Sequence, residues 1–171
     1  MSVAQSYLAE FEGESRITRK FLLRLPEQHL TWKPHAKSMS AGQLALHLAV
    51  VPGQVLKMAV QDSVPVPSFG QGNPQPQSIH EILEAFEASL ATVRDVLPQL
   101  DDASMQKIWS ATKDGQNVLA MPRAAVLRML LFSHWIQHRG QFGVYLRLLG
   151  EKVPSSYGPS ADEMPEFLEA V

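Results

Sequence analysis

PRAAVLRMLLFSHWIQHRGQFGVYLRLLG, residues 122–150, is the stretch of the chain that decides its fold. Pro122 suits the first turn of a helix, where its missing N–H leaves no intrahelical bond unmade, and Gly150 suits the position just past a helix end. These two residues frame a long segment that is mostly apolar. We therefore predict one long helix between them, the last helix of the protein.

A first helix is predicted from Ala4 to Leu25. Apolar residues recur there at close to helical spacing, which is typical of a helix with one buried face, and Pro26 stops the pattern. The apolar positions are Tyr7, Leu8, Phe11, Ile17, Phe21, Leu22 and Leu25.

A second helix is predicted to begin after Ser40. Gln43 follows three residues later in the pattern of a capping box, and the helix would run toward Val60. Pro52 and Gly53 lie inside this stretch. We expect them to kink or locally break the helix, because proline removes a backbone donor and clashes with the preceding turn.

A third helix is predicted to begin after Ser78, which forms the same capping pattern with Glu81, and to end before Pro98. The segment Val64 to Gln77, VPVPSFGQGNPQPQ, separates it from the second helix. Four prolines and two glycines in this segment exclude a regular helix or a central strand, so we expect a long crossover loop. The apolar stripe of the third helix is Ile82, Leu83, Phe86, Leu90, Val93 and Leu97.

Four helical segments with one long connection predict an all-α fold, a four-helix bundle with at least one crossover. Residues 101–121 have a mixed pattern with a turn signal at Lys113-Asp114-Gly115, and both a short hairpin and an irregular excursion remain open there. A length of 171 residues fits one domain spanning residues 1–171, with a core large enough to need no disulfide.

The charge pattern argues against two classes of partner. With 15 Lys and Arg against 17 Asp and Glu and no basic run, nucleic acid is not an expected partner. The most apolar stretch, Ala124 to Phe132, is interrupted by Arg128 and is far shorter than the roughly 20 residues of a membrane span. Residues 1–14 are acidic and unlike a secretory signal, so a cytoplasmic location is expected.

The sequence contains no cysteine. Thiolate zinc sites, a cysteine nucleophile and disulfides are thereby excluded, and any metal must use His, Asp or Glu.

His134 and His138 are the first candidates for such a site. They lie four residues apart in the last helix, so their side chains share one face, and Gln141 and Tyr145 continue this polar stripe. A buried polar group without a partner costs roughly 1–3 kcal/mol, and a metal, a water or a carboxylate would satisfy the imidazoles. Alone, the pair is a weak motif, and surface or hydrogen-bonded histidines are the commoner explanation.

His47 is a candidate third ligand. It is a polar residue among Leu44, Leu46, Leu48 and Ala49 in the second helix. A single core histidine bonded to a carbonyl is the alternative explanation. Spacing alone does not bring His47 to His134 and His138.

A set of motifs is spread along the chain: Trp32-Lys33-Pro34, SMSAGQLALHLA at residues 38–49, HWIQHRGQ at residues 134–141, Pro154 and Tyr157-Gly158-Pro159. With these motifs the chain resembles the DinB/YfiT-like family of metal-dependent four-helix-bundle proteins over nearly all of its length. The resemblance implies an up-down-down-up bundle, with the crossover at Val64 to Gln77, and frequent homodimers. It also implies that one histidine of the second helix and two of the fourth bind a divalent metal, which here match His47, His134 and His138.

The remaining candidates are given a structural role. His29, His35 and His80 are expected at the surface, and Arg139 is expected in a surface or interhelical salt bridge. Trp135 is expected in the core or an interface. The methionines Met58, Met105, Met121 and Met129 are expected to serve packing.

Three neutral histidines leave a coordination position open, as in catalytic metal sites. A metal lowers the pKa of bound water toward ~7 or holds a thiol as thiolate. Some relatives implied by the resemblance are transferases or isomerases that use a small thiol, so we expect a thiol-transferase type of enzyme acting on a small molecule. Nickel or zinc is the expected metal, and iron also accepts imidazole.

Two alternatives stay open. A hydrolase would use metal-bound water and would benefit from a carboxylate base, but no Asp or Glu flanks His134 or His138 in sequence, and only Glu14 or Glu84 could approach in the fold. A non-catalytic, metal-stabilised binding module is the other reading, because a fold does not establish turnover.

Overall fold

The structure is a computed structural model and describes residues 1–66, 73–165 and 168. It is mostly helical, as expected, and the predicted first and third helices are confirmed within a few residues at each end. The last helix differs from the expected regular helix, because a π-helical segment, η3, lies between two α-helices. The long helices are α1 (Val3–Leu22), α2 (Ala41–Ala59) and α3 (Ile79–Val96). The last helical segment consists of α5 (Arg123–Leu127), η3 (Arg128–His134) and α6 (Trp135–Leu148), which follow one another directly.

The helix starts show why these segments begin where they do. Ser40 accepts the backbone N–H of Gln43 at 3.1 Å, and the Gln43 side chain accepts the N–H of Ser40 at 2.9 Å, which completes the predicted capping box. At α3, Ser78 accepts the N–H of Glu81, but the Glu81 carboxylate accepts from Gln77 and not from Ser78. Both caps satisfy donors that a helix start leaves unpaired.

A small three-stranded sheet corrects the all-α prediction. Its order is β1-β2-β3, with β1 parallel to β2 and β2 antiparallel to β3. The shorter elements are β1 (Ser63–Pro65), β2 (Ile108–Lys113), β3 (Gln116–Pro122), α4 (Asp102–Gln106), η1 (Glu27–His29) and η2 (Leu97–Gln99).

The hairpin of β2 and β3 decides between the alternatives left open for residues 101–121. Asp114 and Gly115 both have positive φ, 52° and 76°, as a two-residue turn between twisted strands requires. β1 takes the first residues of the predicted crossover loop, and Pro65 is tolerated because β1 is an edge strand. Residues 67–72 of that predicted loop lie outside the described residues.

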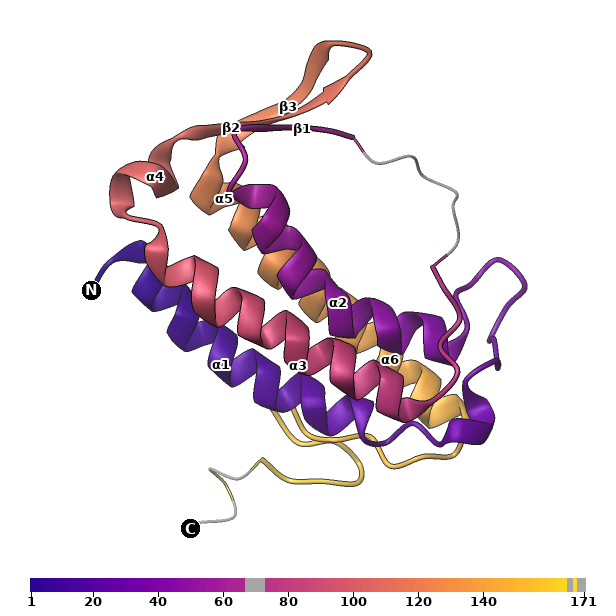
Figure 1. Cartoon of the computed structure of the whole chain (residues 1–171). Coiled ribbons are helices and arrows are strands. Elements are labelled where there is room, and N and C mark those ends of the chain that lie inside the picture. The colour runs from indigo at the N-terminus through magenta and orange to yellow at the C-terminus, as the bar shows by residue number, and fades with distance from the viewer. Residues whose placement is uncertain (67–72, 166–167, 169–171) are drawn as a thin grey trace.

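The long helices pack around an aromatic core. In Figure 1, α2 and α3 run in the direction opposite to α1 and α6, and the sheet lies across the end of α2 and the beginning of the last helical segment. Trp135 is buried in this core, as expected, and stacks on Phe11 of α1 with ring centroids 5.5 Å apart. Its ring also lies 6.5 Å from that of Phe86 of α3. One residue of the last helical segment therefore contacts two other helices.

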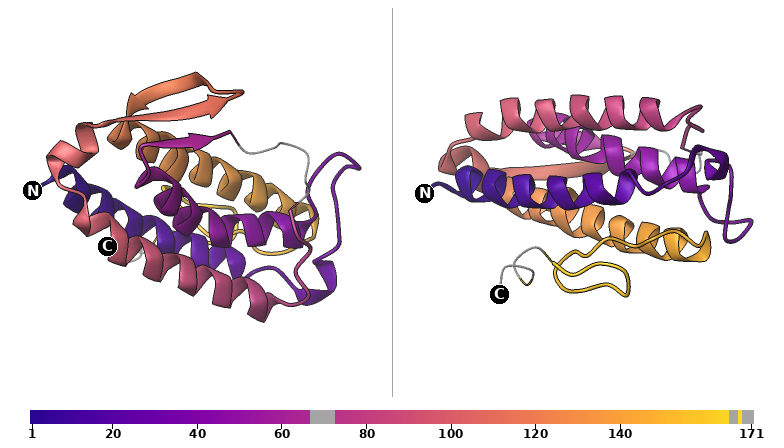
Figure 2. Two further views of the ribbon diagram at one scale, coloured as in Figure 1. Left: turned by 45° about the horizontal axis from the view of Figure 1, so that its top comes forward. Right: turned by 90° about the horizontal axis from the view of Figure 1, so that it is seen from below.

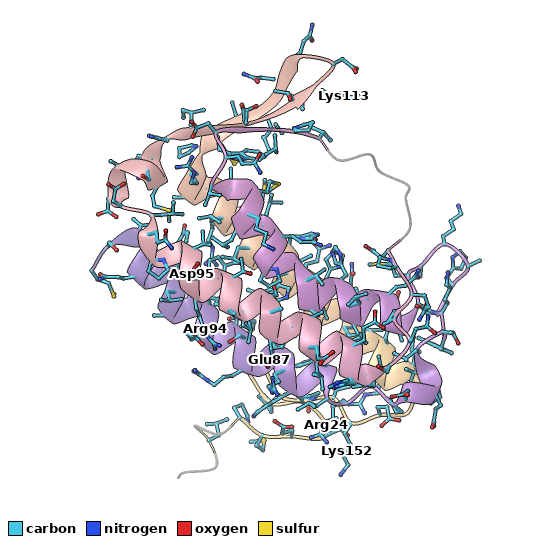
Figure 3. All side chains as sticks on the ribbon, in the orientation of Figure 1. Arg24, Glu87, Arg94, Asp95, Lys113 and Lys152 are labelled. Carbon is cyan, nitrogen blue, oxygen red and sulfur yellow. The ribbon has the colours of Figure 1, made fainter. Side chains whose placement is uncertain are left out.

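Charged side chains lie around this core on the outer faces (Figure 3). Arg94 of α3 makes two hydrogen bonds to Glu12 of α1, at 2.7 and 2.9 Å, and Arg19 pairs with Glu87 between the same helices. These pairs are half exposed, and pairs of this kind contribute roughly 0–1 kcal/mol each. Burial of the apolar faces, not surface charge, therefore dominates the stability of the bundle.

The chain after α6 returns along the side of the bundle away from the sheet (Figure 2). It is held there by Tyr157, whose hydroxyl donates to Glu14 at 2.8 Å and accepts from Arg139 at 2.7 Å. Arg139 also pairs with Glu14 at 2.6 Å, and both side chains are buried. Burial and the neighbouring Glu14 raise the pKa of Tyr157 to about 12, so its hydroxyl stays protonated as a donor. Arg139 thus forms the expected interhelical salt bridge.

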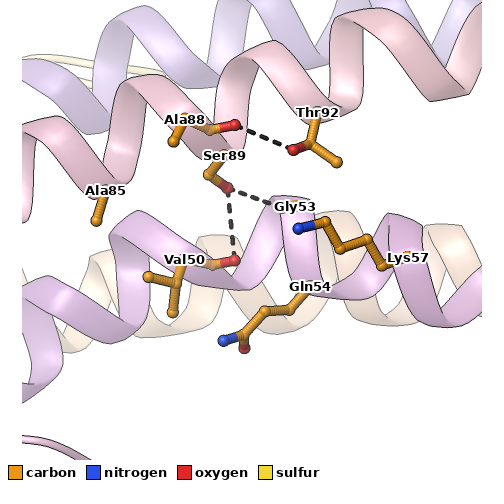
Figure 4. A pocket seen from close by; sticks show the side chains of 8 residues that line it. All are labelled: Val50, Gly53, Gln54, Lys57, Ala85, Ala88, Ser89 and Thr92. Carbon is orange, nitrogen blue, oxygen red and sulfur yellow. Dashed lines mark hydrogen bonds between the residues drawn. The ribbon is translucent and has the colours of Figure 1, made fainter.

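Pro52 does not break α2, which runs without interruption from Ala41 to Ala59, so of the expected kink or local break only the break is contradicted. Proline has no N–H for the carbonyl of Leu48, and that carbonyl accepts the indole Nε1–H of Trp135 at 2.8 Å instead. The N–H of Gly53 donates to Ser89 Oγ of α3 at 2.8 Å (Figure 4). A side chain at Gly53 would place its Cβ 3.1 Å from Ser89, so glycine allows the close approach of α2 and α3. Groups disturbed by the proline are therefore satisfied by neighbouring helices.

In the described part of the chain, no helix has the length and apolar character needed to cross a lipid bilayer.

A double-mutant cycle tests the role of Pro52. Trp135→Phe leaves the Leu48 carbonyl buried and unpaired, at a cost of ~1–3 kcal/mol beyond lost packing. In Pro52→Ala, the restored N–H of residue 52 can donate to that carbonyl. We therefore expect Trp135→Phe to cost about 1 kcal/mol less in the Pro52→Ala background than in the wild type, measured by urea unfolding.

The control for this cycle is Trp109→Phe, because the indole of Trp109 donates to the carbonyl of Met58 at 3.3 Å. Its cost should be the same in both backgrounds. If Trp135→Phe lowers the free energy of unfolding equally in both backgrounds, Pro52 is not the reason that the Leu48 carbonyl is free to accept the indole N–H.

Candidate metal centre

Three histidines from different parts of the chain lie together between α2 and the last helical segment. His47 comes from the middle of α2, His134 ends the π-helical segment, and His138 follows one turn later in α6. One ring nitrogen from each lies within 4.8 Å of the other two. The structure thus brings together the three residues that the resemblance selected, including His47, which spacing could not place.

The rings are arranged around a common point. Each pair is nearly perpendicular, with interplanar angles of 88°, 87° and 85° and centroids 4.5–5.4 Å apart. The Nε2 atoms of His134 and His138 are 2.9 Å apart. Zinc–imidazole bonds are about 2.0–2.1 Å long, so two nitrogens bound at roughly 90–110° lie about 2.9–3.4 Å apart. The separation therefore fits two nitrogens that share one ion.

Gln141 decides which nitrogen of His138 faces the centre. The Oε1 atom of Gln141 lies 2.8 Å from Nδ1 of His138. An amide oxygen only accepts, so Nδ1 carries the proton and Nε2 presents its lone pair to His134. Metal-binding histidines are oriented in this way by an acceptor on the outer nitrogen. In this tautomer, Nε2 of His134 must either donate to His138 or share a cation with it.

His134 has a second unusual feature. Its Nδ1 atom is buried and has no hydrogen-bond partner of normal geometry among the described residues. A buried polar atom without a partner is costly in a folded protein, and such atoms occur at functional sites. A cation bound between the facing Nε2 atoms leaves Nδ1 of His134 as the outer nitrogen, beside the carbonyl of Leu130, where a metal-binding histidine normally finds its acceptor.

The electrostatics favour neutral imidazoles. Burial, with smaller contributions from the neighbouring His138 and His134, lowers the pKa of His47 to about 4. Burial and His138 also lower the pKa of His134, while the carbonyl of Leu130 acts in the opposite direction. Both rings are therefore neutral at neutral pH. A metal ligand needs this state, because a protonated imidazole has no free lone pair.

The π-helical turn before His134 was not predicted. Ser133 Oγ donates to the carbonyl of Arg128 five residues earlier, at 3.2 Å. A π-turn inserts one residue relative to an α-helix and occurs frequently at functional sites. It changes which residues before His134 share its face. Regular apolar spacing in the sequence gives no signal for such an insertion.

A cavity of about 670 Å³ adjoins the centre, and His47 and His134 form part of its wall. The sheet forms another part of the wall, through residues such as Trp109 and Leu119. The sequence does not predict this cavity, because one of its walls depends on the pairing of β1 with the hairpin.

The other candidate residues stay outside the centre. His35 and His80 are exposed as expected, whereas His29 is half buried. Glu84 lies 3.2 Å from His80 on the surface of α3, and Glu14 is held by Arg139 on another face of the bundle. Among the described residues, no carboxylate therefore joins the histidine group.

Of the roles expected for the remaining residues, some are found in the structure and others are not. Met105 is fully buried and Met58 and Met121 pack against the sheet, in accord with a packing role, but Met129 is partly exposed at the cavity. Tyr145 points away from the centre, since its hydroxyl donates to the carbonyl of Met39 at 3.3 Å. Of the polar stripe beyond His138, only Gln141 contributes to the centre.

A sequence model of the DinB family matches residues 1–167 of the chain. The chain belongs to the DinB family. It is 30% identical over 171 residues to the uncharacterized protein YrdA of Bacillus subtilis (strain 168), covering 96% of this chain and 94% of YrdA.

Two crystal structures share the DinB-like fold. A DinB-like protein from Bacillus cereus ATCC 10987 matches with a TM-score of 0.70 and 22% identity, over 90% of this chain and 97% of that one. The DinB-like protein YjoA of Bacillus subtilis matches with a TM-score of 0.65 and 17% identity, over 85% and 92% of the two chains. At these identities the likeness concerns the fold.

Gln141 offers a test of the centre that leaves all three histidines in place. In Gln141→Leu, His138 loses the acceptor that holds its Nδ1 proton, and outer partners of this kind change metal affinity about 10–100-fold. We expect the affinity for Co²⁺, measured by titration of metal-free protein, to fall by that factor. The matched control is Gln137→Leu, an exposed glutamine on the same helix, which should leave affinity unchanged. Equal affinities for both variants would contradict the role of Gln141.

Proposed function

We propose that His47, His134 and His138 bind one divalent transition metal, and that the protein is a metal-dependent enzyme of the thiol-transferase type. The observation that carries this proposal is the meeting of three ring nitrogens within 4.8 Å, from two helices, without a carboxylate in the group. Nickel or zinc suits three imidazoles best, and iron is compatible with them.

When bound, the metal supplies an open coordination position at which a small thiol loses its proton and becomes nucleophilic at neutral pH. The protein's own residues prepare this position. His47 and His134 are kept neutral by burial, and Gln141 directs Nε2 of His138 inward. The apolar walls of the adjoining cavity exclude water from one side of the centre.

A thiol is favoured over water as the nucleophile for a structural reason. Hydrolysis by metal-bound water benefits from a carboxylate base, and Glu14 and Glu84 are both held elsewhere. A thiol loses its proton more readily than water and needs such a base less. The chain has no cysteine, so the sulfur would come from a cosubstrate.

The proposed transfer balances without an oxidant or a reductant. The thiol sulfur forms a bond to an electrophilic carbon of the second substrate. The bond from that carbon to its leaving group breaks and the electron pair departs with the leaving group, while the thiol proton passes to solvent.

We also propose five properties that the sequence and the family resemblance led us to expect. They are a single domain, an up-down-down-up four-helix topology, a homodimer, a cytoplasmic location and no nucleic-acid partner. The opposite directions of α2 and α3 relative to α1 and α6 support the topology (Figure 1).

Cobalt substitution tests the metal and the thiol together. Metal-free protein should bind one equivalent of Co²⁺, and His47→Ala, His134→Ala or His138→Ala should weaken binding by at least about 100-fold, because each removes one of three ligands. His80→Ala is the matched control, since His80 is exposed on α3 and should leave binding unchanged.

Addition of N-acetylcysteine to the cobalt protein should then produce a sulfur-to-cobalt charge-transfer band in the near ultraviolet. Cobalt binding that survives all three substitutions would contradict the metal centre. Cobalt binding at the three histidines without any thiol band would contradict the transferase proposal and favour the hydrolase or the non-catalytic module.

A further inference from the structure

The cavity beside the histidines is a feature of the described structure that the metal centre does not explain. It has a volume of about 670 Å³, within the range of about 300–1,000 Å³ that is typical of small-molecule sites. Its walls come from α2, from η3 and from all three strands of the sheet. Its lining residues are His47, Val51, Gln54, Val55, Met58, Val64, Pro65, Val66, Trp109, Ala111, Val118, Leu119, Met129, Leu130 and His134.

The chemistry of this lining selects an uncharged occupant. Among the described residues that line it, none carries an Asp, Glu, Lys or Arg side chain, and the polar side chains are Gln54, His47 and His134 apart from the indole of Trp109. The indole N–H of Trp109 is already donated to the carbonyl of Met58, so this residue offers its aromatic ring. A charge buried here would lose its hydration without gaining a partner, which is strongly unfavourable.

The wall formed by the sheet is a packed structure. Val64, Trp109 and Ala111 of the sheet bury their side chains with Val126 in a cluster separate from the main core. Met58 and Leu130, which line the cavity from the helices, pack against this cluster. The cavity wall is therefore preformed, so a ligand need not order it, which lowers the entropic cost of binding.

The cavity meets the metal centre on one side. His47 and His134 belong both to its wall and to the histidine group, whereas His138 belongs only to the group. A molecule in the cavity would therefore present one end to the centre and keep the rest of its surface against apolar side chains.

We propose that this cavity binds an uncharged, largely apolar small molecule, the electrophilic substrate of the proposed transfer, with its reactive end beside His47 and His134. This inference rests on the proposed function for the identity of the reactive end. The preference for an uncharged apolar ligand depends on the cavity alone and is testable in metal-free protein.

The first experiment uses the uncharged fluorescent probe N-phenyl-1-naphthylamine and the metal-free full chain. Val118 of β3 lines the cavity and is 55% exposed, while Ile108 of β2 does not line it and is 60% exposed. Both are β-branched apolar residues of one hairpin whose replacement disturbs little packing. Val118→Glu should weaken probe binding at least ten-fold, and Ile108→Glu should change it less than two-fold.

Two further measurements test the same preference for an uncharged ligand without relying on Val118→Glu alone. Met129→Glu places a charge on the wall formed by η3 and should weaken probe binding as Val118→Glu does. In competition, 4-phenylbutan-1-ol should displace the probe at a concentration at least ten-fold lower than 4-phenylbutyrate, because only the alcohol is uncharged. Non-saturable probe binding, equal effects of Val118→Glu and Ile108→Glu, or equal potency of the two competitors would overturn the proposal.

A second experiment measures how close the ligand lies to the metal centre. One equivalent of Co²⁺ should quench the bound probe and Zn²⁺ should not, because only Co²⁺ has partly filled d orbitals that accept the excitation. His138→Ala should abolish quenching while keeping probe affinity, since His138 does not line the cavity. Probe binding without quenching, although Co²⁺ is bound, would separate the cavity from the centre and overturn the placement of the reactive end. Failure of Co²⁺ to bind would instead contradict the proposed metal centre.

Discussion

The hydrogen bond from the indole of Trp135 to the carbonyl of Leu48, at 2.8 Å, is the interaction on which the site depends. Each partner is next in sequence to a histidine of the centre: Leu48 follows His47, and Trp135 follows His134. The bond fixes α2 and the last helical segment in one register, and Pro52 leaves the carbonyl free for it. A side chain at the centre of the aromatic core thereby determines how far His47 lies from His134.

The helices could be predicted because their signals are local. The Ser40 and Ser78 caps, the apolar stripes and the flanking prolines each act within a few residues. The sheet depends on pairing between distant residues, and β1 is only three residues long and contains Pro65. The turn signal at Asp114 and Gly115 pointed to the hairpin but could not show that β1 would join it. The π-helical segment leaves no mark in the apolar spacing.

The candidate site, too, could be predicted only in part from local signals. Helical spacing predicted that His134 and His138 share a face and that the polar residue Gln141 lies on it, whereas only the family resemblance predicted that His47 lies near them. The orientation of the His138 ring, the burial of Nδ1 of His134 and the cavity wall depend on the folded structure and could not be read from the sequence. The structure therefore adds a reason for the centre that the resemblance did not contain: burial keeps His47 and His134 neutral, and Gln141 orients His138.

The most direct test of the centre is an anomalous diffraction measurement on crystals of the protein loaded with one equivalent of Zn²⁺. The account predicts one peak at about 2.0–2.1 Å from a ring nitrogen of each of His47, His134 and His138, as expected for zinc–imidazole bonds. A peak elsewhere on the chain, or no peak between these rings while Nε2 of His134 and His138 stay in hydrogen-bond contact, would contradict it.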